Sequence, residues 1–145
     1  YEEWQDMFLR FRHHLFPHMR PDACEAVVRR FEVFLGDDAN FAYPHAVRHG
    51  DFGTSNILHD PASGTITGIL DWSFVGLGDP ALDVAALLAS YGQPFIQRLA
   101  PHYAGLDALL PRVGFYHSTF ALQEALAGAE NGDLEAFERG IASYR

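Results

Sequence analysis

The chain has 145 residues, of which 48% are apolar and 20% are charged, a balance that is ordinary for one soluble globular domain. Its formal net charge of −9 argues against a nucleic-acid-binding protein, because such domains carry a basic surface. The single cysteine, Cys24, excludes an internal disulfide, and no apolar run is long enough to span a membrane. No signal-peptide pattern opens the chain. We therefore expect a cytoplasmic protein with no nucleic-acid and no membrane partner.

The first third of the chain predicts two amphipathic helices and a short strand. Apolar residues recur at steps of three and four over residues 2–16 and again over residues 21–35. Pro17 and Pro21 interrupt the pattern between the two helices. A short apolar segment at residues 46–48 then predicts a strand that leads into the central loop.

Histidines near the end of the first helix raise the alternative of a metal site. His14 and His18 are four residues apart, and His13 is adjacent, but Pro17 interrupts the helix on which this spacing would bring them together. We therefore favour solvated surface histidines over a metal site. For Cys24 we favour inert packing over a reactive role.

The middle of the chain predicts a loop followed by a β-hairpin. The loop occupies residues 49–56, and the turn-rich sequence Asp-Pro-Ala-Ser-Gly follows at residues 60–64. A hairpin that closes in this turn brings Asn56 and Asp71 together at its open end, facing Asp51. Its two strands are expected at residues 57–58 and 65–70.

The remainder of the chain predicts four further helices. Gly-Leu-Gly at residues 76–78 predicts a turn, after which Asp79 caps a central, largely apolar helix whose first residue is Pro80. The later helices are expected at residues 94–103, 106–129 and 134–144. The expected fold class is therefore α+β and mainly helical, with a small β-hairpin that carries the central loop.

The polar side chains at the open end of the hairpin suit phosphate chemistry. Asn56 and Asp71 offer oxygen ligands at an open site, which Mg²⁺ prefers when it also carries substrate phosphates. Asp51 is not needed for the metal and can accept a proton from a hydroxyl nucleophile. A lone loop Asp would as readily cap backbone amides, but its two partners favour a catalytic Asp51. Protein kinases have the same layout.

Three linked motifs resemble the aminoglycoside phosphotransferase and choline kinase superfamily of small-molecule kinases. The motifs are His-Gly-Asp at residues 49–51 with Asn56, Gly-Ile-Leu-Asp-Trp at residues 68–72, and Gly-Asp-Pro at residues 78–80 with Asp83. The resemblance implies an ATP-dependent phosphotransferase that acts on a hydroxyl of a small molecule, such as an aminoglycoside or another amino alcohol. It implies Asp51 as the catalytic base, with Asn56 and Asp71 as ligands of Mg²⁺.

The same resemblance implies roles for several flanking residues. His49 is expected to fix the loop by hydrogen bonding, and Asp79 and Asp83 are expected to brace the loop that follows Asp71. Acceptor-binding residues, often acidic, are expected in the last helices. The available acids are Glu124, Glu130, Asp133 and Glu135, each of which we interpret first as a solvated helix charge.

Two features of nucleotide-binding kinase lobes are absent from the sequence. The chain contains no lysine and no Gly-x-Gly-x-x-Gly loop. We therefore expect residues 1–145 to form the C-terminal lobe of a longer protein with a protein-kinase-like fold. Its partner is expected to be the N-terminal nucleotide lobe of the same protein, and the lobe alone is expected to be inactive.

Two other functions are compatible with these residues. A non-catalytic kinase-like binding or scaffold module would use the same lobe, although the complete set of site residues argues against it. A metal-dependent hydrolase would use Asp51 and Asp71 with water in place of a hydroxyl acceptor.

Overall fold

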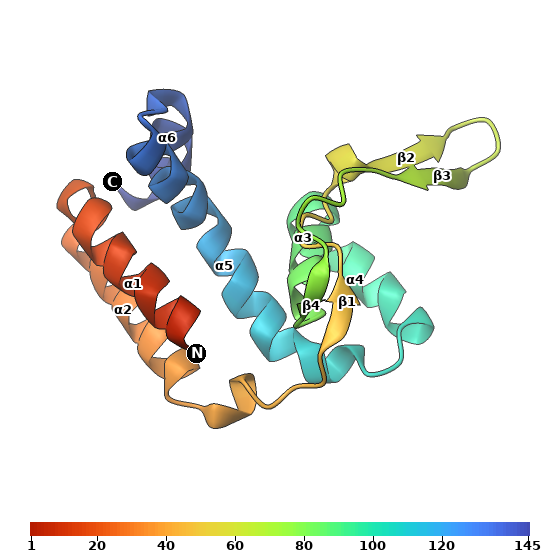
Figure 1. Cartoon of the computed structure of the whole chain (residues 1–145), viewed down its shortest axis with the longest axis horizontal. Helices are drawn as coiled ribbons and strands as arrows, with labels where there is room; N and C mark the ends of the chain where they lie inside the picture. The colour runs from red at the N-terminus through yellow and green to blue at the C-terminus, as the bar shows by residue number, and fades with distance from the viewer. The chain divides into compact units, whose positions relative to one another are not determined.

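The computed structural model describes residues 1–145 and divides into two compact units. Unit 1 consists of Tyr1–Ala42 and Ser118–Arg145, and unit 2 consists of Tyr43–His117. The second boundary falls inside one long helix, α5 (Leu106–Asn131) (Figure 1).

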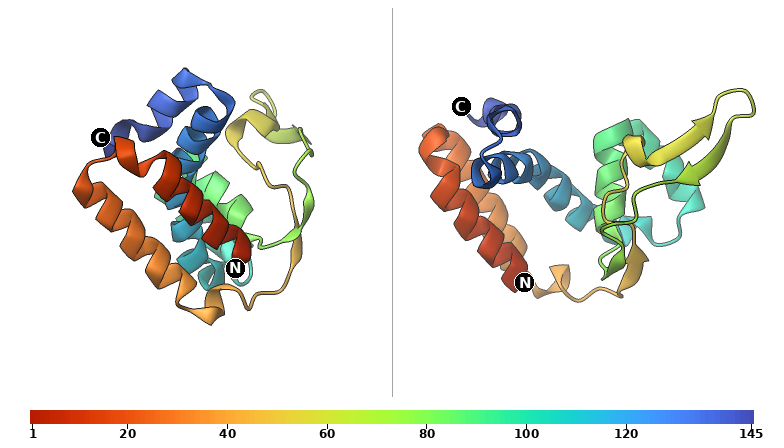
Figure 2. Two further views of the ribbon diagram at one scale, coloured as in Figure 1. Left: turned by 60° about the vertical axis from the view of Figure 1, so that its left-hand side comes forward. Right: turned by 45° about the horizontal axis from the view of Figure 1, so that its top comes forward.

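Unit 1 is helical. Its first two helices, α1 (Glu2–His14) and α2 (Pro21–Leu35), lie side by side and are joined by a single 3-10 turn (Figure 2). The ring of Phe8 stacks on that of Phe31 with centroids 4.7 Å apart, and Phe11 meets Phe31 edge-on at 5.9 Å. Both predicted helices are thus confirmed. The fully buried apolar residues of the unit are Phe11, Leu15, Val27, Phe31, Leu122, Ala125 and Ile141.

The last helix, α6 (Leu134–Ile141), approaches the end of α5 closely. The Asp133 carboxylate caps α6 by accepting a hydrogen bond from the Ala136 amide at 3.0 Å. A Cβ on Gly128 would collide with the backbone of Phe137. The sequence predicted this helix over residues 106–129, and it ends two residues later at Asn131; Gly128 lies within the helix, where it permits close packing.

Unit 2 contains four strands in two antiparallel pairs. β1 (Ala46–Arg48) pairs with β4 (Gly76–Gly78), and β2 (Ile57–Asp60) pairs with β3 (Thr65–Ile69). The predicted turn at residues 76–78 is therefore wrong. Two glycines in three residues disfavour a strand locally, but pairing with β1 supplies the backbone hydrogen bonds that make this segment one.

The β2–β3 hairpin closes at the predicted turn, but its register is shifted. Ile57 pairs with Ile69, and a bulge between Leu58 and His59 displaces the pairing closer to the turn. Asn56 consequently accepts a hydrogen bond at its carbonyl from the Leu70 amide, at 2.8 Å. Asp71 lies one residue beyond this bridge. The sequence placed Asn56 opposite Asp71 because it assumed a turn centred between residues 63 and 64, whereas the pairing of Asp60 with Thr65 centres the turn between residues 62 and 63.

Two helices complete unit 2, α3 (Ala81–Tyr91) and α4 (Gln93–Leu99). α3 begins one residue later than predicted, after Pro80, and buries Ala81, Val84 and Ala85. The β2–β3 hairpin extends beyond these helices in both views (Figures 1 and 2). Helices predominate and the sheets are small, which confirms the predicted α+β class. None of the helices is both long and apolar enough to traverse a lipid bilayer.

We predict that replacing glycine with alanine has opposite effects on the free energy of unfolding at two positions of α5. Gly128→Ala should lower the free energy of unfolding by about 1–3 kcal/mol, because the new Cβ collides with the Phe137 backbone. Gly114→Ala should raise it by about 0.5–1 kcal/mol, because nothing lies near that position and alanine favours helix. Urea denaturation of the full-length protein measures both. A stable Gly128→Ala variant would contradict the close packing of α5 and α6.

Candidate active site

The loop between β1 and β2 carries Asp51, whose side chain is exposed. Gly50 precedes it with φ of 89°, and an added Cβ there would lie 2.6 Å from the Phe74 carbonyl oxygen. Only glycine satisfies both the dihedral angle and the space. The glycine of the His-Gly-Asp motif is therefore required by the backbone path into Asp51.

The carboxamide of Asn56 holds Asp51 from within the loop. Asn56 is 8% exposed, and its Nδ2 donates to the Asp51 carbonyl at 2.9 Å and to Asp51 Oδ2 at 3.0 Å. Because both neighbours are oxygen acceptors, the atom facing them must be the NH2 group, which fixes the orientation of the amide. Asn56 Oδ1 is then left for another partner. The structure therefore brings together two of the three predicted site residues by direct contact.

The third predicted site residue, Asp71, lies on the other arm of the hairpin mouth. It is exposed and has φ of 56°, in the left-handed region that Asp tolerates better than most residues. Its Oδ1 accepts hydrogen bonds from the Ser73 hydroxyl at 2.5 Å and the Ser73 amide at 3.4 Å. These donors hold the pKa of the Asp71 carboxyl below its usual value. Asp71 is therefore ionised at neutral pH.

His49 links the two arms of the site. Its ring is buried, and Nδ1 accepts a hydrogen bond from the Asp51 amide at 3.2 Å. The proton must then be on Nε2, which donates to the Leu70 carbonyl at 2.8 Å. Because both ring nitrogens are engaged, His49 fixes the loop and is not free to act as a base. This is the structural role that the sequence predicted.

Asp83 braces the same loop from the first turn of α3. Its two carboxylate oxygens accept hydrogen bonds from consecutive backbone amides, His49 at 2.7 Å and Gly50 at 2.9 Å. The sequence predicted a brace for the segment after Asp71. The brace in fact holds the segment before Asp51, because α3 packs under the loop.

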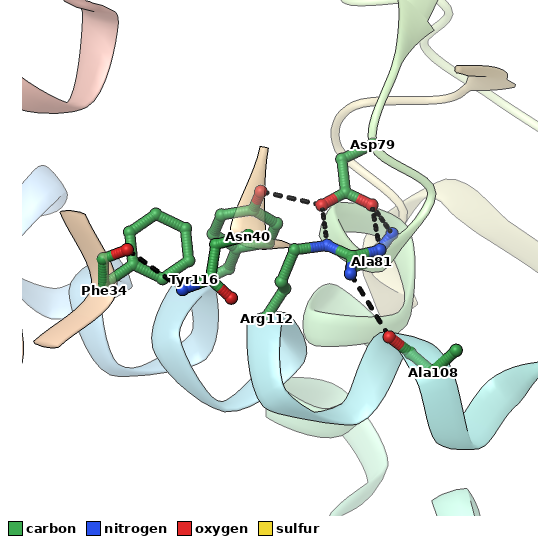
Figure 3. Close-up of polar contacts among 7 residues, drawn as sticks. All are labelled: Phe34, Asn40, Asp79, Ala81, Ala108, Arg112 and Tyr116. Carbon is green, nitrogen blue, oxygen red and sulfur yellow. Dashed lines mark hydrogen bonds and ion pairs between the residues drawn. The ribbon is translucent and has the colours of Figure 1, made fainter. Parts of the chain in front are cut away.

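Asp79 belongs to a separate buried cluster with α5 (Figure 3). Its carboxylate, 5% exposed, accepts hydrogen bonds from Arg112 Nε at 2.6 Å, Arg112 Nη2 at 3.2 Å and the Tyr116 hydroxyl at 2.8 Å. It also accepts from the Ala81 amide at 3.0 Å. The sequence prediction that Asp79 braces the loop after Asp71 is therefore wrong. Nothing local in the sequence pointed to Arg112 or Tyr116, which lie 33 and 37 positions away.

The remaining candidates are engaged elsewhere. No group of three or more His, Cys, Asp or Glu side chains is arranged to hold a metal ion. Burial raises the pKa of the Cys24 thiol, which lowers its reactivity. The four acids of the last helices all have partners in the protein: Glu124 and Glu135 pair with Arg139, Glu130 pairs with Arg10 of α1, and Asp133 caps α6.

The oxygens at the hairpin mouth fit a hard divalent cation. Asn56 Oδ1 has no protein donor to bind, and Asp71 is an exposed, ionised carboxylate that keeps Oδ2 free of protein hydrogen bonds. One amide oxygen and one carboxylate are a donor set that suits Mg²⁺ when water and phosphate complete its shell.

The buried cluster predicts a loss of stability at alkaline pH. Burial, and then the hydrogen bond to Asp79, raises the pKa of Tyr116 above its usual value. A group whose pKa is higher in the folded state than in the unfolded state stabilises the fold fully only below its unfolded-state pKa, which is about 10 for tyrosine. As the pH rises above that value, this contribution to the free energy of unfolding is lost. Above about pH 10, Tyr116 should therefore lower the free energy of unfolding by up to about 1.4 kcal/mol per pH unit.

Urea titrations between about pH 8 and about pH 11 measure this slope. In Tyr116→Phe the free energy of unfolding should decrease less steeply with pH than in the parent protein. Tyr103→Phe, which changes an exposed ring, should show the same pH dependence as the parent. Parallel curves for the parent and Tyr116→Phe would contradict a protonated, buried Tyr116.

Known proteins share this sequence and this fold. The model of the phosphotransferase enzyme family (APH) matches residues 1–116. Viomycin phosphotransferase of Streptomyces vinaceus is 37% identical over 149 residues, which cover 99% of this chain and 50% of that protein. The GDP complex of aminoglycoside 2'-phosphotransferase-IIIa superposes with a TM-score of 0.87 at 21% identity, covering 97% of this chain and 48% of that chain. Macrolide 2'-phosphotransferase type I gives a TM-score of 0.78 at 23% identity, covering 99% of this chain and 47% of that chain.

The solved structures are too distant in sequence to show more than a common fold, that of the C-terminal lobe of aminoglycoside phosphotransferases. The chain spans about half the length of each of these three proteins. The family match covers most of the chain and includes the central loop, the hairpin and all of α3. The chain therefore belongs to the phosphotransferase enzyme family.

Proposed function

We propose that the full-length protein transfers the γ-phosphoryl group of ATP to a hydroxyl group of a small molecule. The observation that carries this proposal is the contact between Asn56 Nδ2 and the exposed Asp51 carboxylate, with ionised Asp71 on the other arm of the hairpin mouth. Membership of the phosphotransferase enzyme family supports it.

Asp51 is the general base in this reaction. As the acceptor oxygen attacks, a bond forms from that oxygen to the γ-phosphorus, and the bond from the γ-phosphorus to the β–γ bridging oxygen breaks. The hydroxyl proton passes to Asp51. Because Asn56 occupies Asp51 Oδ2, the carboxylate is oriented with Oδ1 available for the hydroxyl.

Asn56 and Asp71 hold Mg²⁺, which when bound neutralises charge on the nucleotide phosphates. The contribution of the chain is to keep these two ligands aligned. The Leu70 amide bonds the Asn56 carbonyl, and His49 bonds the Leu70 carbonyl, so the residue before Asp71 is fixed on both sides. ATP is the expected donor, and the GDP complex of a structural neighbour makes GTP the competing donor to test.

The acceptor is a small molecule that carries a hydroxyl group. Viomycin phosphotransferase is named for viomycin, and the structural neighbours are named for aminoglycosides and macrolides, which supports an antibiotic-like acceptor. The net charge of −9 favours a cationic, amine-bearing acceptor over an anionic one.

The N-terminal lobe of the same protein is the partner that completes the nucleotide site. Apolar side chains on the strands and on the segment between β3 and β4 are exposed in this chain, among them Leu77 at 73% and Phe74 at 64%. Such a surface is typical of an interaction site. The isolated chain lacks the lysine of kinase nucleotide lobes and is inactive by this proposal.

Substitution of the proposed base tests the function. Asp51→Ala in the full-length protein should lower kcat by roughly 10²–10⁴, because a positioned general base contributes about that factor. The nucleotide KM should change little, since Asp51 is not a proposed ligand of the metal. Nucleotide diphosphate release is measured with viomycin, kanamycin and a macrolide as acceptors, using ATP and GTP in turn.

Asp6→Ala is the matched control, because Asp6 forms only an exposed ion pair with Arg10 at 3.7 Å. Near-normal turnover in Asp51→Ala would refute the role of Asp51. Nucleotide breakdown that no acceptor increases would favour the hydrolase alternative, and no turnover with any donor would favour the scaffold alternative.

Substitution of the proposed metal ligands tests the cofactor. Asp71→Asn should raise the Mg²⁺ concentration for half-maximal activity by at least about tenfold, because a neutral amide replaces a charged ligand. Asn56→Ala should do the same and should also lower kcat, since it frees the Asp51 carboxylate. EDTA should abolish turnover of the parent. An unchanged Mg²⁺ dependence in Asp71→Asn would contradict the ligand set.

A further inference from the structure

We propose that Arg112 and Tyr116 of α5 are positioning residues for the catalytic loop. They fix the Asp79 carboxylate and thereby set the first turn of α3, whose Asp83 holds the loop backbone ahead of Asp51. The inference rests on the proposed phosphotransfer for its effect on turnover, whereas its effect on the loop can be measured independently.

The first link is a buried carboxylate whose side-chain partners come from α5. Arg112 donates to both oxygens of Asp79 and Tyr116 donates to one, while all three residues are at most 8% exposed (Figure 3). The guanidinium is itself held in place. Its Nη1 donates to the Ala108 carbonyl at 3.2 Å, and its carbon lies 4.9 Å from the centroid of the Tyr43 ring. A forked, stacked arginine of this kind fixes both the position and the direction of its partner.

The second link is the start of α3, which joins Asp79 to Asp83. Asp79 accepts the Ala81 amide with its side chain and the Leu82 amide with its carbonyl, at 3.0 and 3.2 Å. Asp83 follows four residues later, one helical turn along. A displacement of Asp79 therefore moves the first turn of α3 and Asp83 with it.

The third link leads from Asp83 to the reacting groups. Asp83 accepts the amides of His49 and Gly50, and the His49 ring bonds the Asp51 amide and the Leu70 carbonyl. The Asp83 carboxylate on α3 is thus linked by hydrogen bonds to both arms of the site. A side chain on α5 that makes no contact with the loop can set the orientation of Asp51 through this chain of hydrogen bonds.

Amide hydrogen exchange in the full-length protein tests the coupling without an activity assay. Arg112→Lys keeps the charge but loses the fork, and Tyr116→Phe removes one hydrogen bond to Asp79. We expect the His49 and Gly50 amides to exchange about tenfold faster or more in Arg112→Lys, because a hydrogen bond to a charged group contributes about that factor. A smaller acceleration at the same amides is expected in Tyr116→Phe.

Buried helix amides of the same unit, those of Ala85 and Val113, report opening of the unit as a whole. Their exchange should change less than that of His49 and Gly50. Equal acceleration at all four amides would overturn the proposal in favour of a purely stabilising Arg112, and so would unchanged exchange at His49 and Gly50. Arg98→Lys and Tyr103→Phe, at exposed positions of the same unit, are the matched controls and should leave the parent rates intact.

Turnover then separates the two proposals. Arg112→Lys should lower kcat by about tenfold or more with a nearly unchanged nucleotide KM, because a displaced Asp51 affects the chemical step. A fall in the concentration of folded enzyme would lower the apparent kcat in the same way, but it would also accelerate exchange throughout unit 2, which is the observation that tells the two apart. If the parent transfers phosphate to no acceptor, the proposed function fails while amide exchange still decides the role of Arg112 and Tyr116.

Discussion

The carboxylate of Asp83 accepts hydrogen bonds from two consecutive backbone amides, and the geometry of the candidate active site depends on them. His49 and Gly50 lie where the chain turns from β1 into Asp51, and the positive φ of Gly50 directs that turn. Buried amides require acceptors, and here one side chain on α3 satisfies both. Because the His49 ring then bonds Asp51 and Leu70, the order imposed by Asp83 reaches both arms of the hairpin mouth.

The acids of unit 2 differ in exposure, and this difference separates structural from chemical roles. Asp79 is buried and fully hydrogen-bonded, so its ion pair with Arg112 meets the geometric condition under which a buried charge pair is tolerated. Asp51 and Asp71 are exposed and keep oxygens free of protein donors. Of these three acids, a ligand can therefore reach only Asp51 and Asp71. The phosphotransfer proposal therefore rests on the exposed acids, and the buried ones support them.

Asp51 and Asp71 are exposed in this chain, which spans about half the length of the three proteins compared above. Apolar side chains beside the catalytic loop are exposed, including Trp72, whose ring lies 4.7 Å from that of His49. A second lobe would both cover this surface and supply the phosphate-binding groups that the chain lacks. The arrangement is consistent with a lobe that presents a base and metal ligands to a nucleotide held from the other side.

The sequence by itself determined the helices, the hairpin turn, the family and the three candidate site residues, because periodicity, turn chemistry and motif spacing are properties of neighbouring residues. Only the tertiary structure decided that residues 76–78 form a strand, that the hairpin register sets Asn56 opposite Leu70, and that Asp79 and Asp83 hold different elements. Each of these depends on a partner brought close by folding. The hydrogen bonds of Asp79 with α5 and those of Asp83 with the loop join residues 33 to 37 positions apart, a separation at which no local pattern carries information.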